Sequence, residues 1–104
     1  MARAVRRSAR FQAELRDAFG AERGPNGEPS LNDVERLVLD GVGWAFGEFC
    51  EEQTQVPGTD LRVLIRTSGP FVPMVFFARL VEVDGEEVVE MVSVVPDFNY
   101  EWDD

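Results

Sequence analysis

The chain has 104 residues and a formal net charge of −10, with 20 acidic residues against 10 basic ones, all of them arginine. Histidine and lysine are absent, which excludes Ser-His-Asp and Cys-His catalysis, ordinary zinc catalysis and Schiff-base chemistry. The single cysteine, Cys50, excludes an internal disulfide and a cysteine-cluster site, so we expect neither a metal nor a cofactor.

The N-terminal part predicts a short strand followed by a helix. Residues 2–7 alternate weakly and would form an edge strand. Ser8 is suited to be the N-cap of the helix. Phe11, Leu15 and Phe19 then recur at the spacing of one helix face, and a glycine follows as the C-terminal stop. We expect these aromatic and aliphatic side chains to point into the core.

A second helix is expected from Ser30, after a loop rich in glycine and proline. Asp33 follows Ser30 at the spacing of a capping box. Further along stand Gly41, Gly43 and Gly47, and each glycine inside a helix costs about 1 kcal/mol relative to alanine. We therefore expect close packing of this helix against a sheet, a kink, or a break near the first two glycines.

Residues 61–67, LRVLIRT, predict a strand that follows a Pro-Gly turn. Its alternation puts apolar side chains on one face and two arginines on the other. The first face would carry Leu61, Val63 and Ile65, and the second Arg62, Leu64 and Arg66.

Residues 74–96 predict a β-hairpin, because Asp84-Gly85 between two apolar runs is the strongest short-range hairpin signal. A two-residue loop fixes the register. The expected cross-strand pairs are Val83 with Glu86, Val81 with Val88, Arg79 with Glu90, Phe77 with Val92, and Val75 with Val94. Both faces are rich in apolar groups, so we expect helices on one face and further chain or a partner, including a second copy, on the other.

The last eight residues, DFNYEWDD, alternate aromatic and acidic side chains. One interpretation is a last strand or arm that docks its aromatic side chains on the sheet. The other is a recognition tail, with aromatic anchors and with carboxylates for a basic partner or in imitation of a nucleic-acid strand. The candidate partner-binding residues are Phe98, Tyr100, Trp102, Asp103 and Asp104.

These elements predict a single α+β domain over residues 1–104, with residues 96–104 as an acidic, aromatic tail. The expected architecture is two N-terminal helices packed on a C-terminal antiparallel β-meander of three or four strands. No apolar run approaches the roughly 20 residues that cross a bilayer, and no apolar stretch follows the arginine-rich start. We therefore expect a cytoplasmic protein that contacts no membrane, from a GC-rich bacterium or its phage.

With this order of elements, the chain resembles the RelE/ParE superfamily of toxins from bacterial toxin–antitoxin modules. The opening RRSARFQAELRDAF is similar to the basic strand and amphipathic helix that begin those toxins. The stretch LRVLIRTSGPFVPMVFFARLVEVDGEEVVEMVSVV is similar to their strand-loop-strand-turn-strand core. The resemblance implies either ribosome-dependent mRNA cleavage or inhibition of a topoisomerase, with a small antitoxin as protein partner and nucleic acid bound only in the ribosome.

In the mRNA-cleaving members of that superfamily, basic residues of the sheet hold the RNA and stabilise the phosphate transition state, often with help from a C-terminal residue. By position, the resemblance implies Arg62, Arg66 and Tyr100 as catalytic residues, with Arg79 as a weaker candidate because Glu90 faces it. An arginine can bind phosphate through two hydrogen bonds, and a tyrosine can exchange a proton or stack on a base.

A second function class fits the composition. The net charge of −10 and the acidic tail favour a non-enzymatic interaction protein, phage-encoded for example, that binds and inhibits a basic host protein or mimics nucleic acid. The residue types alone leave both alternatives open.

Overall fold

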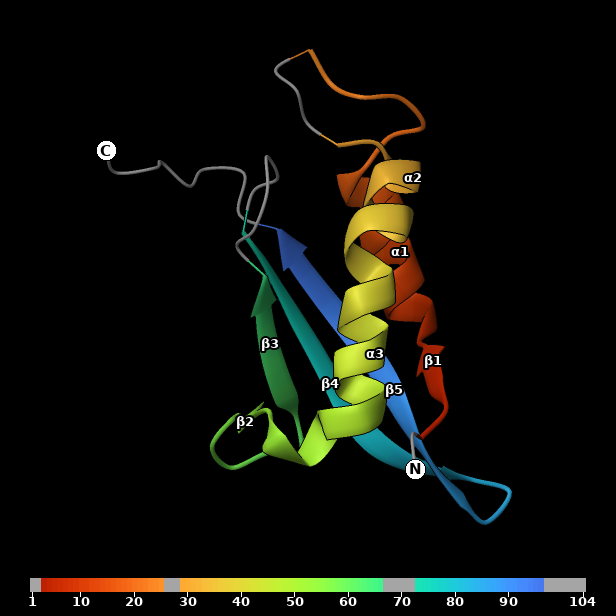
Figure 1. The fold of residues 1–104 in the computed structure, drawn as a ribbon, viewed down its shortest axis with the longest axis vertical. Helices are drawn as coiled ribbons and strands as arrows, with labels where there is room; N and C mark the ends of the chain where they lie inside the picture. The colour runs from red at the N-terminus through yellow and green to blue at the C-terminus, as the bar shows by residue number, and fades with distance from the viewer. Residues whose placement is uncertain (1–2, 26–28, 67–72, 97–104) are drawn as a thin grey trace.

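The computed structural model describes residues 3–25, 29–66 and 73–96 (Figure 1). One long helix, a shorter helix and one sheet make up this α+β fold. The helical segments are α1 (Ala9–Ala18), α2 (Leu31–Val34), the π-helical turn η1 (Glu35–Leu39), α3 (Asp40–Phe49) and the 3₁₀ turn η2 (Cys50–Glu52). The strands are β1 (Val5–Arg7), β2 (Thr54–Gln55), β3 (Arg62–Arg66), β4 (Met74–Val83) and β5 (Glu86–Pro96).

The sheet has five strands in the order β1-β5-β4-β3-β2, and it is mixed because β1 runs parallel to β5. The expected architecture, two N-terminal helices on an antiparallel meander of three or four strands, is therefore wrong. The first strand belongs to the sheet and pairs with the edge of β5. Just before this strand, the Ala4 carbonyl accepts a hydrogen bond from the Val89 amide at 2.9 Å. A three-residue strand is too short for its sequence to specify a partner or a direction.

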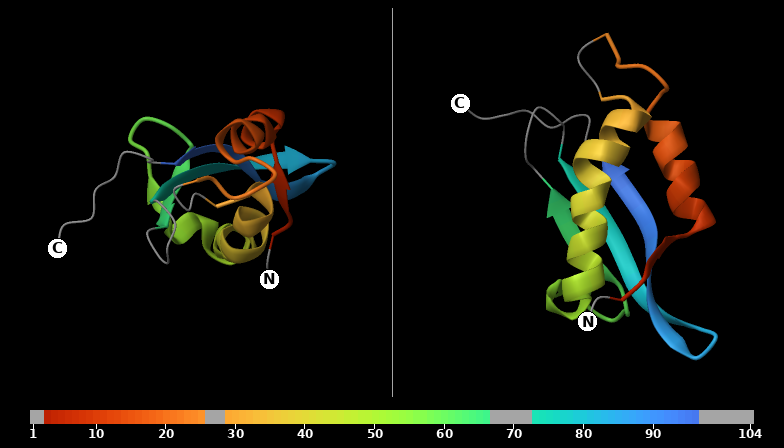
Figure 2. Two further views of the ribbon diagram at one scale, coloured as in Figure 1. Left: turned by 90° about the horizontal axis from the view of Figure 1, so that it is seen from above. Right: turned by 45° about the vertical axis from the view of Figure 1, so that its right-hand side comes forward.

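The helices also differ from that expectation in their placement. Segments α2, η1, α3 and η2 follow one another without a gap and form one long helix over residues 31–52, which covers one face of the sheet (Figure 2). Helix α1 lies instead along the β5 edge, beyond the point where β1 ends (Figures 1 and 2). The long helix passes through Gly41 and Gly43 without the break that the glycines allowed.

Both helix starts are capped as the sequence predicts. The Ser8 hydroxyl accepts a hydrogen bond from the Phe11 amide at 3.0 Å. At the second helix, the Ser30 hydroxyl accepts from the Asp33 amide at 3.1 Å, while the Asp33 carboxylate accepts from the Ser30 amide at 3.0 Å. This capping box satisfies two amides that would otherwise lack partners in the first turn.

The core lies between the long helix, α1 and one face of the sheet. The helices contribute Phe11 and Phe46, and β4 contributes Phe76, all three fully buried. The rings of Phe11 and Phe76 pack with their centroids 6.4 Å apart. Further core residues are Leu15, Phe19, Val34, Leu39, Val42, Cys50, Met74, Ala78, Val89, Met91 and Val94. No described helix lies across the opposite face of the sheet, which we call the open face. Its apolar residues include Val63, Ile65, Val75, Phe77 and Val95.

The β4–β5 hairpin confirms the predicted turn and the first half of the predicted register. Asp84 and Gly85 have φ values of 51° and 82°, as a type I′ turn requires. Pairing proceeds as expected from the turn to Arg79 opposite Glu90. Beyond that point a β-bulge shifts the register, so the expected pairing of Phe77 with Val92 is wrong: Phe77 lies opposite Ser93.

No helix among the described residues is both long enough and apolar enough to cross a lipid bilayer.

Candidate functional site

The β-bulge in β5 shapes the open face. Met91 pairs with Ala78 and Ser93 pairs with Phe77, so Val92 is the extra residue. A bulge lets two successive side chains lie on one side of the sheet, and Val92 and Ser93 both line the same surface hollow. The next residue, Val94, then turns toward the core and is only 2% exposed.

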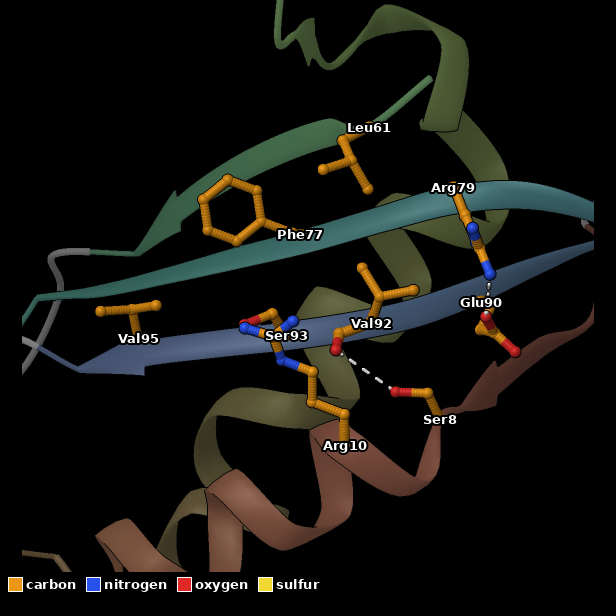
Figure 3. A pocket seen from close by; sticks show the side chains of 9 residues that line it. All are labelled: Ser8, Arg10, Leu61, Phe77, Arg79, Glu90, Val92, Ser93 and Val95. Carbon is orange, nitrogen blue, oxygen red and sulfur yellow. Dashed lines mark hydrogen bonds and ion pairs between the residues drawn. The ribbon is translucent and has the colours of Figure 1, made fainter. Parts of the chain in front are cut away.

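This hollow is a groove of about 550 Å³ on the open face (Figure 3). It runs from the start of β3 across β4 and β5 to the N-terminus of α1. Its apolar lining is Leu61, Phe77, Val92 and Val95, and its polar lining is Ser8, Arg10, Arg79, Glu90 and Ser93. A volume of this order suits a few side chains of a bound segment. We call this hollow the open-face groove.

A three-residue ion cluster borders one end of the groove. Glu90 of β5 lies between Arg6 of β1 and Arg79 of β4, with Arg6 Nη2 at 2.8 Å and Arg79 Nη2 at 3.2 Å from its oxygens. The Glu90 side chain is 11% exposed, whereas those of Arg6 and Arg79 are about half exposed. Two guanidinium groups thus share one carboxylate, which leaves this end with a surplus positive charge.

Helix α1 closes the other side of the groove and the edge of β5. Ser8 Oγ donates to the Val92 carbonyl at 3.3 Å. The Glu14 carboxylate accepts from Ser93 Oγ at 2.8 Å and from the Val94 amide at 3.2 Å. Arg10 lies 3.6 Å from Glu14, and its side chain is 76% exposed. The edge of β5 beyond β1 is therefore held by Ser8 and Glu14, and Arg10, which pairs with Glu14, remains largely exposed beside the groove.

The polar groups of the groove are engaged within the protein. The hydroxyl groups of Ser8 and Ser93 and the carboxylate of Glu90, which line it, all have intramolecular hydrogen bonds. Within residues 3–25, 29–66 and 73–96, no three His, Cys, Asp or Glu side chains gather to hold a metal ion. An apolar floor with fixed polar groups at its rim orients a ligand without offering a free nucleophile.

The arginines implied by the family resemblance lie away from this groove. Arg62 pairs with Ala78, on the core face, and its Nη1 donates to the carbonyls of Gln53 at 3.1 Å and Glu51 at 3.3 Å. It therefore binds the last turn of the long helix and the residue that follows that helix. Of the three sheet arginines considered from the sequence, Arg79 alone lines the groove.

Arg66 lies beneath the long helix. A β-carbon placed on Gly41 would come within 3.3 Å of Arg66 Nη2, so the absence of a side chain at that position makes room for the guanidinium. Arg66 Nε is buried and has no hydrogen-bond partner in the described part of the chain. The structure does not bring Arg62, Arg66 and Arg79 together on one surface.

Tyr100 and the other tail candidates, Phe98, Trp102, Asp103 and Asp104, lie outside the described residues. The structure therefore tests neither their role in catalysis nor their role in partner binding.

The basic N-terminal segment finds acidic partners inside the fold. The Arg3 guanidinium donates hydrogen bonds to the carboxylates of Glu51 and Glu87, and these bonds raise the pKa of Arg3. Arg7 forms a two-fold hydrogen bond with Glu35 of the long helix, at 2.7 and 2.9 Å. The positive charge that is concentrated at the start of the sequence is thus used to attach β1 to the long helix and to β5.

A second apolar surface lies on the outer side of the long helix. Leu37 is 59% exposed, Trp44 is 61% exposed, and Phe49 contacts Trp44 edge-to-face with ring centroids 5.3 Å apart. Its residues lie far from the groove, on the other side of the sheet, which makes them suitable positions for control substitutions.

Sequence reasoning missed several residues of the groove. Nothing in the sequence of β5 indicates a bulge at Val92, because Val92 stands in the stretch Met91–Val95, which contains no glycine and no charged residue. Ser8 was predicted only as a helix cap, and no role was assigned to Glu14 from the sequence. The apolar character of both hairpin faces was the one available signal, and it indicated an uncovered surface without locating a groove.

No protein-family model matches the chain, and no curated protein sequence matches it. The site is therefore interpreted from its own residues.

Proposed function

We propose that the chain is a non-enzymatic interaction protein that binds one segment of a partner protein in the open-face groove. The observation that carries this proposal is the groove itself, an apolar hollow on a sheet face across which no described helix lies. Covering apolar surface of this kind contributes roughly 25 cal/mol per Å² removed from water.

Charge indicates the chemistry of the partner segment. Arg6, Arg10 and Arg79 border the groove with only Glu14 and Glu90 to balance them, three guanidinium groups against two carboxylates. This is a local positive surplus in a chain whose net charge is −10. A segment that presents aromatic or aliphatic side chains to the floor and carboxylates to this rim is the complementary ligand.

A comparison of charge variants tests this proposal. Phe77→Asp places a carboxylate in the apolar floor, and Leu37→Asp places one at an exposed apolar position on the long helix. When tagged full-length chains are expressed in the native host and their complexes are quantified, we expect Phe77→Asp to reduce the recovered partner at least about tenfold, the usual cost of a central interface residue. Leu37→Asp should leave it unchanged.

Equal recovery with both variants would contradict the proposal. Circular dichroism of both purified variants ensures that the comparison is made between folded proteins. If the partner is lost with Leu37→Asp and recovered with Phe77→Asp, the partner binds the long helix and not the groove.

A second candidate is a RelE/ParE-like toxin that acts on translation or on a topoisomerase. What supports it is the order of elements, a basic first strand, an amphipathic helix, a second helix and then three antiparallel strands. The positions of Arg62 and Arg66 beneath the helical layer favour a toxin that binds its target over one that cleaves RNA.

Cell-free translation of a defined mRNA tests the nuclease form of the second candidate. A ribosome-dependent nuclease would leave cleaved mRNA only when ribosomes are present, and Arg62→Ala or Arg66→Ala would abolish the cleavage. We expect intact mRNA and a normal product yield. Cleaved mRNA would overturn the interaction proposal in favour of the toxin.

A further inference from the structure

We infer that Arg6 and Arg79 together bind one side-chain carboxylate of the partner segment, and that this contact fixes the position of the segment in the open-face groove. We call Arg6, Glu90 and Arg79 the arginine clamp. Its natural ligand is the partner of the proposed function, on which this inference rests. The clamp itself stands on separate observations: the alignment of its three side chains, the donors that they leave unused, and the spacing of the apolar floor.

The three residues of the clamp form one row across the sheet. Arg6 of β1 pairs with Glu90 of β5, and Glu90 pairs with Arg79 of β4. Directly opposite residues carry their side chains on the same face of a sheet. Glu90 and Arg79 line the open-face groove, and Figure 3 shows their side chains meeting there. Both guanidinium groups therefore lie on the open face, beside a single carboxylate.

Glu90 holds the two guanidinium groups in place. Its side chain is only 11% exposed, and burial strengthens its attraction to the two arginines. Arg6 donates from Nε to Oε2 of Glu90 at 3.0 Å, and Arg79 donates from Nη2 to Oε1 at 3.2 Å. Side chains that are already ordered lose little conformational entropy when a ligand binds. The clamp is therefore preorganised for an anion.

Most of the hydrogen-bond donors of the clamp remain available. A guanidinium has five N–H donors. Arg6 contacts Glu90 through Nε and Nη2, whereas Arg79 contacts it through Nη2 alone. Both arginine side chains are about half exposed, and within the described part of the chain Glu90 is the only carboxylate that pairs with either. A second carboxylate above the row would cancel the surplus charge and accept charge-assisted hydrogen bonds from both arginines.

The apolar floor continues from the clamp at the spacing of an extended chain. On β4, Phe77 is two residues from Arg79, or roughly 7 Å, and Val75 is four residues away, or roughly 13 Å. Val95, which lines the groove, pairs with Val75. An extended segment that lies along these strands repeats its side chains on one face at the same interval. The expected ligand therefore has an acidic residue and apolar residues two and four positions from it.

The open face also continues past the clamp in the other direction. Val81 and Val88 form the next pair on this face toward the hairpin turn, and both are only partly buried. A bound segment therefore has apolar surface on both sides of the clamp. We assign the carboxylate to an aspartate or glutamate within the segment and not to its C-terminus.

Synthetic peptides test the clamp on the full-length chain. The probe is Glu-Thr-Phe-Thr-Val with both ends blocked, and the matched peptide has Gln in place of Glu. The same pair is made in reversed order to cover the opposite chain direction. NMR titrations give the Kd and the place of binding. In one of the two orders, we expect the Glu peptide to bind about tenfold more tightly than the Gln peptide.

The signals that change locate the binding site. We expect the amide signals of Phe77, Arg79 and Val92 to shift during the titration. Those of Leu37 and Trp44, on the long helix, should stay in place. Equal affinity of the Glu and Gln peptides in both orders would overturn the inference, and so would the absence of binding at millimolar peptide concentration.

Three variants connect the preference for the Glu peptide to the clamp. Arg6→Gln and Arg79→Gln should each reduce it to about twofold or less. Each variant leaves Glu90 one arginine, and circular dichroism checks that it folds. Arg36→Gln removes the same charge from an exposed position of the long helix and should leave the preference unchanged. A preference that Arg36→Gln lowers as much as Arg79→Gln would overturn the inference, because long-range charge alone would then explain it.

The peptide and partner experiments fail independently. If the two peptides bind equally while Phe77→Asp still abolishes partner recovery, the clamp is refuted and the proposed function stands. If the Glu peptide is preferred through Arg6 and Arg79 but Phe77→Asp leaves recovery unchanged, the clamp binds carboxylates and the natural partner binds elsewhere.

Discussion

Replacing Gly43 by alanine should stabilise the protein, whereas replacing Gly47 should not. Both glycines lie within α3, and alanine is favoured over glycine inside a helix by about 1 kcal/mol. A β-carbon at Gly43 would meet nothing within 4 Å. We therefore expect Gly43→Ala to gain the full amount, which raises the Tm of a domain of this size by about 4 °C.

At Gly47 the same methyl group has no room. A β-carbon there would lie 3.2 Å from the Arg3 carbonyl oxygen and 3.2 Å from Cγ2 of Val5. The Arg3 backbone is also held to the helix, because its amide donates to the Gly47 carbonyl at 3.1 Å. Overpacking costs roughly 1–3 kcal/mol, which offsets the helical gain, so Gly47→Ala should leave stability unchanged or lower it by up to about 2 kcal/mol.

Thermal and urea unfolding followed by circular dichroism measure both variants. The difference between them, about 1–3 kcal/mol, reports the close approach of β1 to the long helix. If Gly47→Ala proves as stable as Gly43→Ala, β1 does not pack against α3 as described. A loss of stability in Gly43→Ala would instead contradict the helical assignment at that position.

Three further predictions concern single side chains. Hydrogen bonds from Arg23 and from the Ser30 amide hold the pKa of the Asp33 carboxyl well below its usual range. A lowered folded-state pKa adds stability that is present at neutral pH and is lost as the pH falls below about 4, so the stability difference between wild type and Asp33→Asn should shrink between about pH 5 and pH 2. A stability difference that is independent of pH would refute this. Burial raises the pKa of the Cys50 thiol, so thiol reagents should modify native protein only as fast as it unfolds, and rapid modification would contradict its burial. Arg62→Ala should lower the free energy of unfolding, measured in urea, by about 1–2 kcal/mol, because the variant loses two hydrogen bonds to backbone carbonyls. An unchanged free energy of unfolding would contradict this structural role of Arg62.

Local signals in the sequence predicted the local structure. Asp84-Gly85 determined the turn, and the turn determined the pairing as far as Arg79 and Glu90, because a two-residue loop leaves one register. Ser8 and the Ser30 capping box likewise determine where the helices begin. Each of these features depends on residues close together in the chain.

Features that depend on distant contacts were not predictable. The bulge at Val92 is accompanied by hydrogen bonds between β5 and two residues of the α1 region, Ser8 and Glu14, and those partners are about 80 positions apart in the sequence. The alternation of β3 correctly separated Arg62 and Arg66 from the apolar side chains. It did not reveal that the long helix would cover the arginines, since only the packed structure decides which face of a sheet a helix occupies.

The most direct test of the account is photo-crosslinking from the groove in living cells. A benzophenone amino acid replaces Phe77 in one full-length chain and Leu37 in another, and both are irradiated in the native host. The account predicts one defined partner adduct from position 77 and none from position 37. Adducts from position 37 alone, or equally from both positions, would show that the open-face groove is not the surface through which this protein acts.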